Sequence, residues 1–320
     1  MRYSRLLIFL AIAGAVGTAS AQVAGNAAVQ AQWFTGSLEA PSPALPKAGL
    51  MAIEPYVVYQ GNTGTYGNDG GHHSTENNVR QMESVTVFKY GITDRLSIEA
   101  LPSFAHAWND QAKATGVGDL PVELEYRFND ENNETGFPSV TASVGMSFPI
   151  GDYDRLQTPL NGLGTGAYTL KQGLLFQSLF DTPGNHPLRL RLYGAAFERV
   201  ANVGVNDLSV YGTEQGFAGH AAPGFAANVG LGAGYGLNQR WVLAFDLVQH
   251  FAYSTRIQGI DALGNSVNTR EAGSAGTALA PALEYNFSDH LGIIAGIEYS
   301  VAGRNTSSYF APQIALSWSF

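Results

Sequence analysis

Apolar and polar side chains alternate one by one along much of the chain. In the segment 120–128, every second residue is apolar: Leu120, Val122, Leu124, Tyr126 and Phe128. The positions between them carry Glu123, Glu125 and Arg127. A period of two predicts a β-strand with one apolar and one polar face. Clear alternation recurs in the segments 139–148, 187–195, 241–251, 291–301 and 313–320, and a less regular form at 49–61, 80–92, 166–180 and 276–287.

The connections between these segments differ in length in a regular order. Short turns are expected near 92–95, 129–136, 181–187, 237–240 and 286–290. Long loops rich in glycine and small polar residues are expected near 62–79, 109–117, 150–166, 201–219, 255–275 and 303–308. The two classes alternate strictly, which predicts twelve strands with both termini on the short-turn side. The pattern is typical of an all-β transmembrane antiparallel β-barrel with short periplasmic turns and long extracellular loops.

The last strand, QIALSWSF at 313–320, presents an apolar face up to the final residue. Because a spanning sheet cannot leave a free edge in hydrocarbon, this strand is expected to pair with the first one and close the barrel. Lipid would then cover its apolar face. The segment also resembles the C-terminal signal that the barrel-assembly machinery reads, in Gln313, Ala315, Trp318 and the terminal Phe320, although glycine is usual at the Ala315 position.

The short turns also resemble one another, because four of them begin at a tyrosine: Tyr90, Tyr126, Tyr235 and Tyr285. Tyrosines at one end of a membrane barrel form a girdle at the depth of the lipid headgroups. The alternative interpretation is that tyrosine is common near strand ends in any all-β protein.

Composition supports a barrel rather than a soluble domain or a bundle of membrane helices. Charged residues are 13% of the chain, against roughly 25% in soluble domains. The mean hydropathy is nevertheless near zero, and no apolar run after the first 21 residues is long enough for a spanning helix. Cysteine is absent, so disulfides and zinc-thiolate sites are excluded.

The N-terminal region divides into two parts before the predicted barrel at 49–320. Residues 1–21 combine Arg2 and Arg5 with an apolar stretch and a small-residue site, which predicts a signal peptide cleaved after Ala21; a retained anchor helix is the alternative. Its removal takes two arginines and changes the net charge from -9 to about -11, which argues against a nucleic-acid partner. Residues 22–48 are proline-rich and form either a flexible periplasmic lead or a plug in the barrel mouth. Trp33 and Phe34 favour the plug, because large aromatic side chains are more stable when covered than when exposed to water.

Charged residues on the inward faces are the candidate functional residues of the lumen. They are Glu99, Glu123, Glu125, Arg127, Arg189, Arg191, Asp246, Glu284 and Glu298. They would line a solute path or form a structural network of ion pairs, because unpartnered charges in a closed interior are prohibitive. Arg189 and Arg191 are expected to pair with Glu123 and Glu125. The glycines of GLGAGYG at 230–236 would leave lumen space or let the plug approach.

No pattern in the chain predicts catalysis, a metal site or a cofactor. The loop sequence GHHSTEN at 71–77 places His72, His73, Ser74 and Glu76 together, but a loop of this composition is usually solvated. Asp246 and His250 are on one strand face and about 13 Å apart, too far for an acid–base pair. GLGAGYG lacks the following helix of a dinucleotide fingerprint. We therefore expect no enzyme and no cofactor.

Several stretches resemble the MetA-pathway of phenol degradation family of outer-membrane barrels. They are EAPSPALPKAGLMAIEPYVVY, YGITDRLSI, GVGDLPVELEYRF, and VGMSFPIGDYD followed by GLGTGAY. The likeness is densest between 39 and 180. It implies a transporter-like barrel in the outer membrane of a Gram-negative bacterium, passing small aromatic or hydrophobic compounds without a cofactor. The alternative is a structural or receptor barrel with a filled lumen, whose outer loops bind lipopolysaccharide or a surface partner.

Overall fold

The chain folds into a closed antiparallel β-barrel. The structure is a computed structural model that describes residues 32–75, 78–133, 135–184 and 186–320. Within these residues the barrel has twelve strands: β1 (Met51–Tyr66), β3 (Arg80–Thr93), β4 (Leu96–Ala100) with β5 (Ser103–Trp108), β6 (Lys113–Val117) with β7 (Leu120–Asn129), β8 (Ser139–Phe148), β9 (Thr169–Thr182), β10 (His186–Arg199), β13 (Ala226–Gly236), β14 (Trp241–Ala252), β17 (Ser274–Asn286), β18 (Leu291–Arg304) and β19 (Thr306–Ser319). The predicted fold class is confirmed.

The first and last strands close the barrel. β1 and β19 pair from Ala52 opposite Ser319 to Tyr66 opposite Thr306. The Phe320 N–H also donates to the Met51 carbonyl at 2.9 Å. Neither strand therefore presents an unpaired edge, as a barrel in hydrocarbon requires.

Two neighbouring barrel strands are interrupted at similar depth. Leu101 and Pro102 separate β4 from β5, while Gly118 and Asp119 separate β6 from β7. Proline has no N–H to give to a ladder, but its carbonyl accepts from the Thr86 N–H at 3.1 Å. Both β4 and β5 pair with β3, so each interrupted pair counts as one barrel strand.

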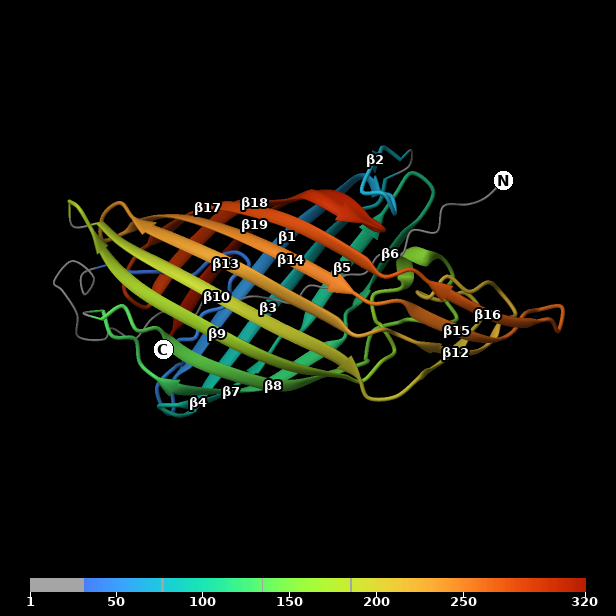
Figure 1. Cartoon of the computed structure of the whole chain (residues 1–320), viewed down its shortest axis with the longest axis horizontal. Helices are drawn as coiled ribbons and strands as arrows, with labels where there is room; N and C mark the ends of the chain where they lie inside the picture. Colours follow the sequence, from blue (N-terminus) through green and yellow to red (C-terminus); the bar gives the residue numbers. More distant parts are fainter. Residues whose placement is uncertain (1–31, 76–77, 134, 185) are drawn as a thin grey trace.

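The two ends of the barrel carry different connections (Figure 1). At the short-turn end, the connections are 94–95, 130–138, 183–185, 237–240 and 287–290, and the C-terminus lies there too. At the long-loop end, the connections 67–79, 149–168, 200–225 and 253–273 are long. The prediction of long loops near 109–117 and 303–308 is wrong. Only residues 109–112 join β5 to β6, and Asn305 alone joins β18 to β19. The hydrogen bonds that pair strands are made by the backbone. Strands can therefore continue through polar segments whose composition is typical of loops.

The expected loops at 201–219 and 255–275 also contain strands. β11 (Val203–Asn206), β12 (Ala218–Ala222), β15 (Thr255–Ile260) and β16 (Ser266–Glu271) form a separate four-stranded sheet beyond the long-loop end. Its core includes Val205, Phe217 and Ile257. At its tip, hydrogen bonds from the side chain and backbone of Asn265 lower the pKa of Asp261 and hold the β15–β16 turn. These strands are too short for alternation to reveal them.

Two shorter elements lie outside the barrel strands and the four-stranded sheet. β2 (His72–His73) pairs with the end of β1, and the 3-10 helix η1 (Pro159–Asn161) packs against β6 within the connection 149–168. No helix in the described residues is both long and apolar enough to cross a membrane.

Large apolar side chains cover the outside of the barrel. The short-turn end carries aromatic pairs with ring centroids 4.6 Å apart for Trp241 and Tyr285 and 4.5 Å apart for Trp318 and Phe320. Tyr90 and Tyr126 are exposed at the same end, on β3 and β7. This band has the composition of the aromatic girdle predicted from the turn sequences.

Candidate functional site

The N-terminal segment formed by residues 32–48, here the inner segment, lies inside the barrel. Its start is held at the short-turn end, where the Trp33 N–H donates to the Gln239 carbonyl at 3.2 Å. Its other end returns there, because the Ala48 N–H donates to Asp94 Oδ1 at 3.1 Å. Between these points most of its side chains are buried. Both ends of the inner segment therefore lie at the short-turn end of the barrel.

Arg189 and Glu284 form the first anchor of the inner segment. The Arg189 Nη2 lies 2.9 Å from Glu284 Oε1 and donates to the Gly36 carbonyl at 2.5 Å. The other Glu284 oxygen accepts from the Thr35 N–H at 2.9 Å. The Arg189 guanidinium also lies 4.3 Å from the centroid of the Phe34 ring, within reach of a cation–π interaction. This buried ion pair thus binds the inner segment on two sides.

Asp246 forms the second anchor, deeper along the inner segment. Its Oδ1 accepts from the Ser37 hydroxyl at 2.5 Å, and its Oδ2 accepts from the Glu39 N–H at 3.0 Å. Arg191 Nη1 donates to the Ala40 carbonyl at 2.9 Å. Hydrogen bonds to an ionised group contribute about 1.5–3 kcal/mol each. Asp246 and Arg191, which are opposite in charge, therefore both bind residues 37–40, here the tip of the inner segment.

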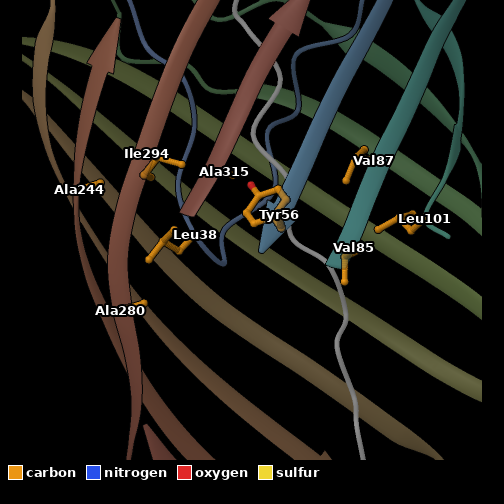
Figure 2. Packing of buried hydrophobic residues seen from close by; sticks show 9 residues of the cluster. All are labelled: Leu38, Tyr56, Val85, Val87, Leu101, Ala244, Ala280, Ile294 and Ala315. Atoms are coloured by element: carbon orange, nitrogen blue, oxygen red, sulfur yellow. The ribbon is translucent and has the colours of Figure 1, made fainter. Parts of the chain in front are cut away.

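Apolar contacts fill the space between these polar anchors. Leu38 is buried among Tyr56, Val85, Val87, Leu101, Ala244, Ala280, Ile294 and Ala315, which come from β1, β3, β14, β17, β18, β19 and the β4–β5 break (Figure 2). Phe34 packs with Leu179 and Val242 in the same way. The inner segment thus gives the short-turn half of the lumen a hydrophobic core that the barrel wall alone lacks.

Glycines of the wall let the inner segment approach this closely. A Cβ on Gly232 would lie 2.6 Å from the Ala40 Cβ, and one on Gly236 would lie 2.2 Å from Gln32 Oε1. On β18, a Cβ on Gly292 would lie 1.9 Å from Thr35 Oγ1. Of the two interpretations of GLGAGYG, the structure supports close approach.

A second group of charges lies on the inward face of the wall. The Lys89 Nζ is 2.8 Å from Glu99 Oε2 and 2.7 Å from Glu125 Oε2. The Lys171 Nζ pairs with Glu123 Oε1. These five residues, here the carboxylate cluster, belong to β3, β4, β7 and β9. Four of them, all except Lys89, line a small cavity that is partly open to solvent.

The nine predicted lumen residues therefore fall into separate groups. The expected pairing of Arg189 and Arg191 with Glu123 and Glu125 is wrong. Arg189 instead pairs with Glu284, and Arg191 donates to Gln177 and Ala40. The tilt of the strands brings together residues whose spacing in sequence gives no hint of contact.

The remaining predicted residues lie at the edges of these groups. Arg127 Nε is 3.1 Å from Asp130 Oδ1 near the short-turn end. Glu298 Oε1 accepts from the Tyr309 hydroxyl at 2.6 Å. Sequence reasoning did not select Lys89 and Lys171, the two cations of the carboxylate cluster. Parity alone would have found Lys89, because it alternates with the outward Phe88 and Tyr90.

The C-terminal residues singled out as an assembly signal point both ways from β19. Trp318 and Phe320 are exposed on the outer face, while Gln313 and Ala315 are buried inside. The Gln313 side-chain amide donates to Glu39 Oε1 at 3.1 Å. Gln313 therefore contacts the inner segment as well.

The residues considered for catalysis are separated in the structure. His72 Nε2 lies 2.8 Å from Ser308 Oγ, and within the described residues no acid is hydrogen-bonded to the His72 ring. Glu76 lies outside the described residues. His250 Nδ1 contacts Asn228 at 3.1 Å rather than Asp246. No group of three metal-ligating side chains in the described ranges is arranged to hold a metal ion.

Comparisons with known proteins place the fold. No family model matches the chain, and no curated protein matches it either. A solved outer membrane channel from Pseudomonas putida F1 is similar with a TM-score of 0.64 and 17% identity, over 87% of this chain and 97% of that one. The transport unit of the autotransporter AIDA-I from Escherichia coli gives a TM-score of 0.50 and 10% identity, over 84% of this chain and 90% of that one. These likenesses establish the barrel fold, while the family resemblance stays a prediction.

Proposed function

We propose that the chain is an outer-membrane channel for small solutes, and that the inner segment closes its lumen. The observation that carries this proposal is the way in which the inner segment is held. Its anchors are side chains of the wall, chiefly Arg189, Asp246 and Glu284. These bonds can be broken without breaking a backbone bond of the barrel. Release of the inner segment would therefore open a path and leave the wall intact.

The proposed solutes are small and pass by diffusion, without a cofactor. A channel in the outer membrane is supported by the fold, and aromatic or hydrophobic solutes are suggested by the family resemblance. Cleavage after Ala21 falls outside the described residues and stays part of the proposal. Lipid and lipopolysaccharide would surround the apolar outside. The barrel-assembly machinery would read the strand that ends in Trp318 and Phe320.

Single-channel recording in planar bilayers tests the proposal. The processed chain should show low conductance with brief openings, because the inner segment fills the lumen. Deleting residues 22–48 should raise the mean conductance at least about tenfold, which corresponds to about 1.4 kcal/mol on the closed–open equilibrium. Uptake of small solutes into liposomes should rise in parallel.

A matched variant distinguishes the effect of losing the anchoring contacts from the effect of shortening the chain. Replacing residues 32–48 with glycine and serine keeps the length and removes the anchored side chains. It should open the barrel as the deletion does, and both variants should show the heat-modifiable gel migration of a folded barrel. A folded deletion variant that stays closed to every solute would contradict the channel.

The second candidate is a structural or receptor barrel with a filled lumen. The four-stranded sheet of β11, β12, β15 and β16 favours it, because a folded unit beyond the barrel offers a surface to lipopolysaccharide or to a surface partner. Under this candidate, deleting residues 22–48 would leave conductance unchanged. Removing the sheet would abolish binding to lipopolysaccharide-bearing cells.

A further inference from the structure

The barrel wall carries two exposed basic residues at the long-loop end. Arg80 is the first residue of β3, and Lys113 is the first residue of β6. Trp108 of β5 is paired with Arg80 on one side and with Lys113 on the other. Residues directly opposite each other on paired strands point to the same face. These three side chains, here the basic row, therefore lie together, with the two cations about 10 Å apart at two strand spacings.

The basic row is on the lipid-facing side of the wall rather than in the lumen. On β3, Arg80 shares its parity with the exposed Met82 and Tyr90. On β6, Lys113 shares its parity with Val117, which is also exposed. Because parity fixes the direction of side chains along a strand, the basic row projects away from the lumen.

The depth of the basic row matches the edge of the apolar band of the barrel. Tyr90, in the aromatic band of the short-turn end, is ten residues from Arg80 along β3. At about 3.3 Å per residue and a strand tilt of about 40°, this stretch spans about 25 Å along the membrane normal, the usual height of the apolar band. The Tyr59 ring centroid lies 6.1 Å from that of Trp108 and 5.9 Å from that of Phe310. The basic row therefore lies among aromatic rings at the depth of lipid headgroups.

Acids on the lipid-facing side do not balance these two cations. The outward positions of β1, β3, β5, β6 and β19 hold no aspartate or glutamate, because Glu54 and Glu83 are buried on the inward face. The turn between β5 and β6 adds one acid, Asp110. Within the described residues, the side chains of Arg80 and Lys113 have neither an ion pair nor a hydrogen bond. Both cations can therefore bind an anion that approaches from outside.

We propose that the basic row binds a phosphate group of lipopolysaccharide in the outer leaflet. The guanidinium and the ammonium group would donate charge-assisted hydrogen bonds to the phosphate oxygens from two sides. The acyl chains would lie against Met82, Phe104 and Val117, which are exposed nearer the middle of the apolar band. Lipopolysaccharide fits because it joins phosphates at headgroup depth to acyl chains. The inference rests on the proposed function, which places the long loops outside the cell, and names a lipid partner for that end of the barrel.

Equilibrium binding in detergent micelles tests the basic row without requiring conduction. Microscale thermophoresis on the purified full chain would compare diphosphorylated lipid A with the same lipid after removal of both phosphates, and with inorganic phosphate. We expect lipid A to bind at least about tenfold more tightly than either, through two charge-assisted contacts and the acyl chains together. Added salt should weaken its binding, because the two cations are exposed. Equal binding of the two lipids, or equal binding of lipid A and inorganic phosphate, would overturn the site.

Two matched variants locate the binding. Arg80→Gln with Lys113→Gln should weaken lipid A binding at least about tenfold. The control is Arg256→Gln with Arg270→Gln, which removes the same charge from exposed positions that pair across β15 and β16, and it should bind as the native chain does. Equal losses in both variants, with folded barrels on gels, would overturn the assignment to the basic row. A loss confined to the control would overturn it in favour of the four-stranded sheet.

The outcome is separable from that of the channel proposal. A barrel that loses lipid A only in the Arg80→Gln and Lys113→Gln variant, yet stays closed after deletion of residues 22–48, would contradict the channel and support the basic row. A barrel that opens on deletion, and whose lipid A binding is unchanged in that variant, would contradict the basic row alone.

Discussion

The two groups of buried charge in the lumen have different partners. Around the inner segment, Arg189, Glu284 and Asp246 bind its backbone and side chains. In the carboxylate cluster, Lys89 and Lys171 pair with glutamates of the wall itself. The first group holds the inner segment, whereas the second joins strand to strand. Similar residues on similar strands therefore bind the inner segment in one group and stabilise the wall in the other.

Removing Lys89 should have the largest effect on stability. Lys89→Met leaves Glu99 and Glu125 buried without their shared cation, and breaking a buried pair in this way costs about 3–5 kcal/mol. Urea unfolding in phospholipid vesicles would measure the free energy of unfolding. Lys113→Met, at an exposed lysine of β6, should change it by less than about 0.5 kcal/mol.

The comparison also predicts what Lys89→Met leaves alone. The open fraction of the folded variant should stay near the native value, because Lys89 pairs with Glu99 and Glu125 of the wall. Adding Glu99→Gln and Glu125→Gln should recover much of the lost stability, since neither amide needs a cation. A Lys89→Met variant that opened the channel without losing stability would contradict the assignment of Lys89 to wall stability.

Asp246→Ala should act mainly on closure. It removes the acceptor of the Ser37 hydroxyl and the Glu39 N–H, which should shift the closed–open equilibrium by about 2 kcal/mol, or roughly thirtyfold. Single-channel recording would show longer open times. Asp261→Ala, in the exposed turn between β15 and β16, is the control and should record as the native channel. An Asp246→Ala variant with native open times would show that the anchor does not hold the inner segment.

Gly232→Ala should produce the smallest of the three effects. The added methyl would lie 2.6 Å from the Ala40 Cβ and 2.8 Å from Asp246 Oδ1, so the tip of the inner segment must move. Overpacking of this kind costs about 1 kcal/mol or more, which would raise the open fraction about fivefold. Gly276→Ala on β17 meets only Thr306 Cγ2, at 3.6 Å, and should leave the open fraction unchanged. Equal recordings from both variants would mean that contact at Gly232 does not control closure.

The lumen shows where sequence reasoning stopped. Alternation placed Glu123, Arg189 and Asp246 on the inward faces, because side-chain direction in a strand is fixed by parity. It paired Arg189 with the wrong partner, because the partner depends on strand tilt and register around the barrel. Glu284 lies 95 residues from Arg189 in the chain, and no local pattern encodes that distance.

The sequence by itself determined that this chain forms a barrel of twelve strands with an apolar outside. Parity, turn length and the apolar face of residues 313–320 are local properties, and membrane lipid demands all of them of any strand that crosses it. Only the tertiary structure decided that both ends of the inner segment lie at the short-turn end, that Asn305 alone connects β18 to β19, and that Arg189 pairs with Glu284. Those outcomes depend on which distant side chains meet inside a closed ring, and the ring exists only once β1 and β19 have paired.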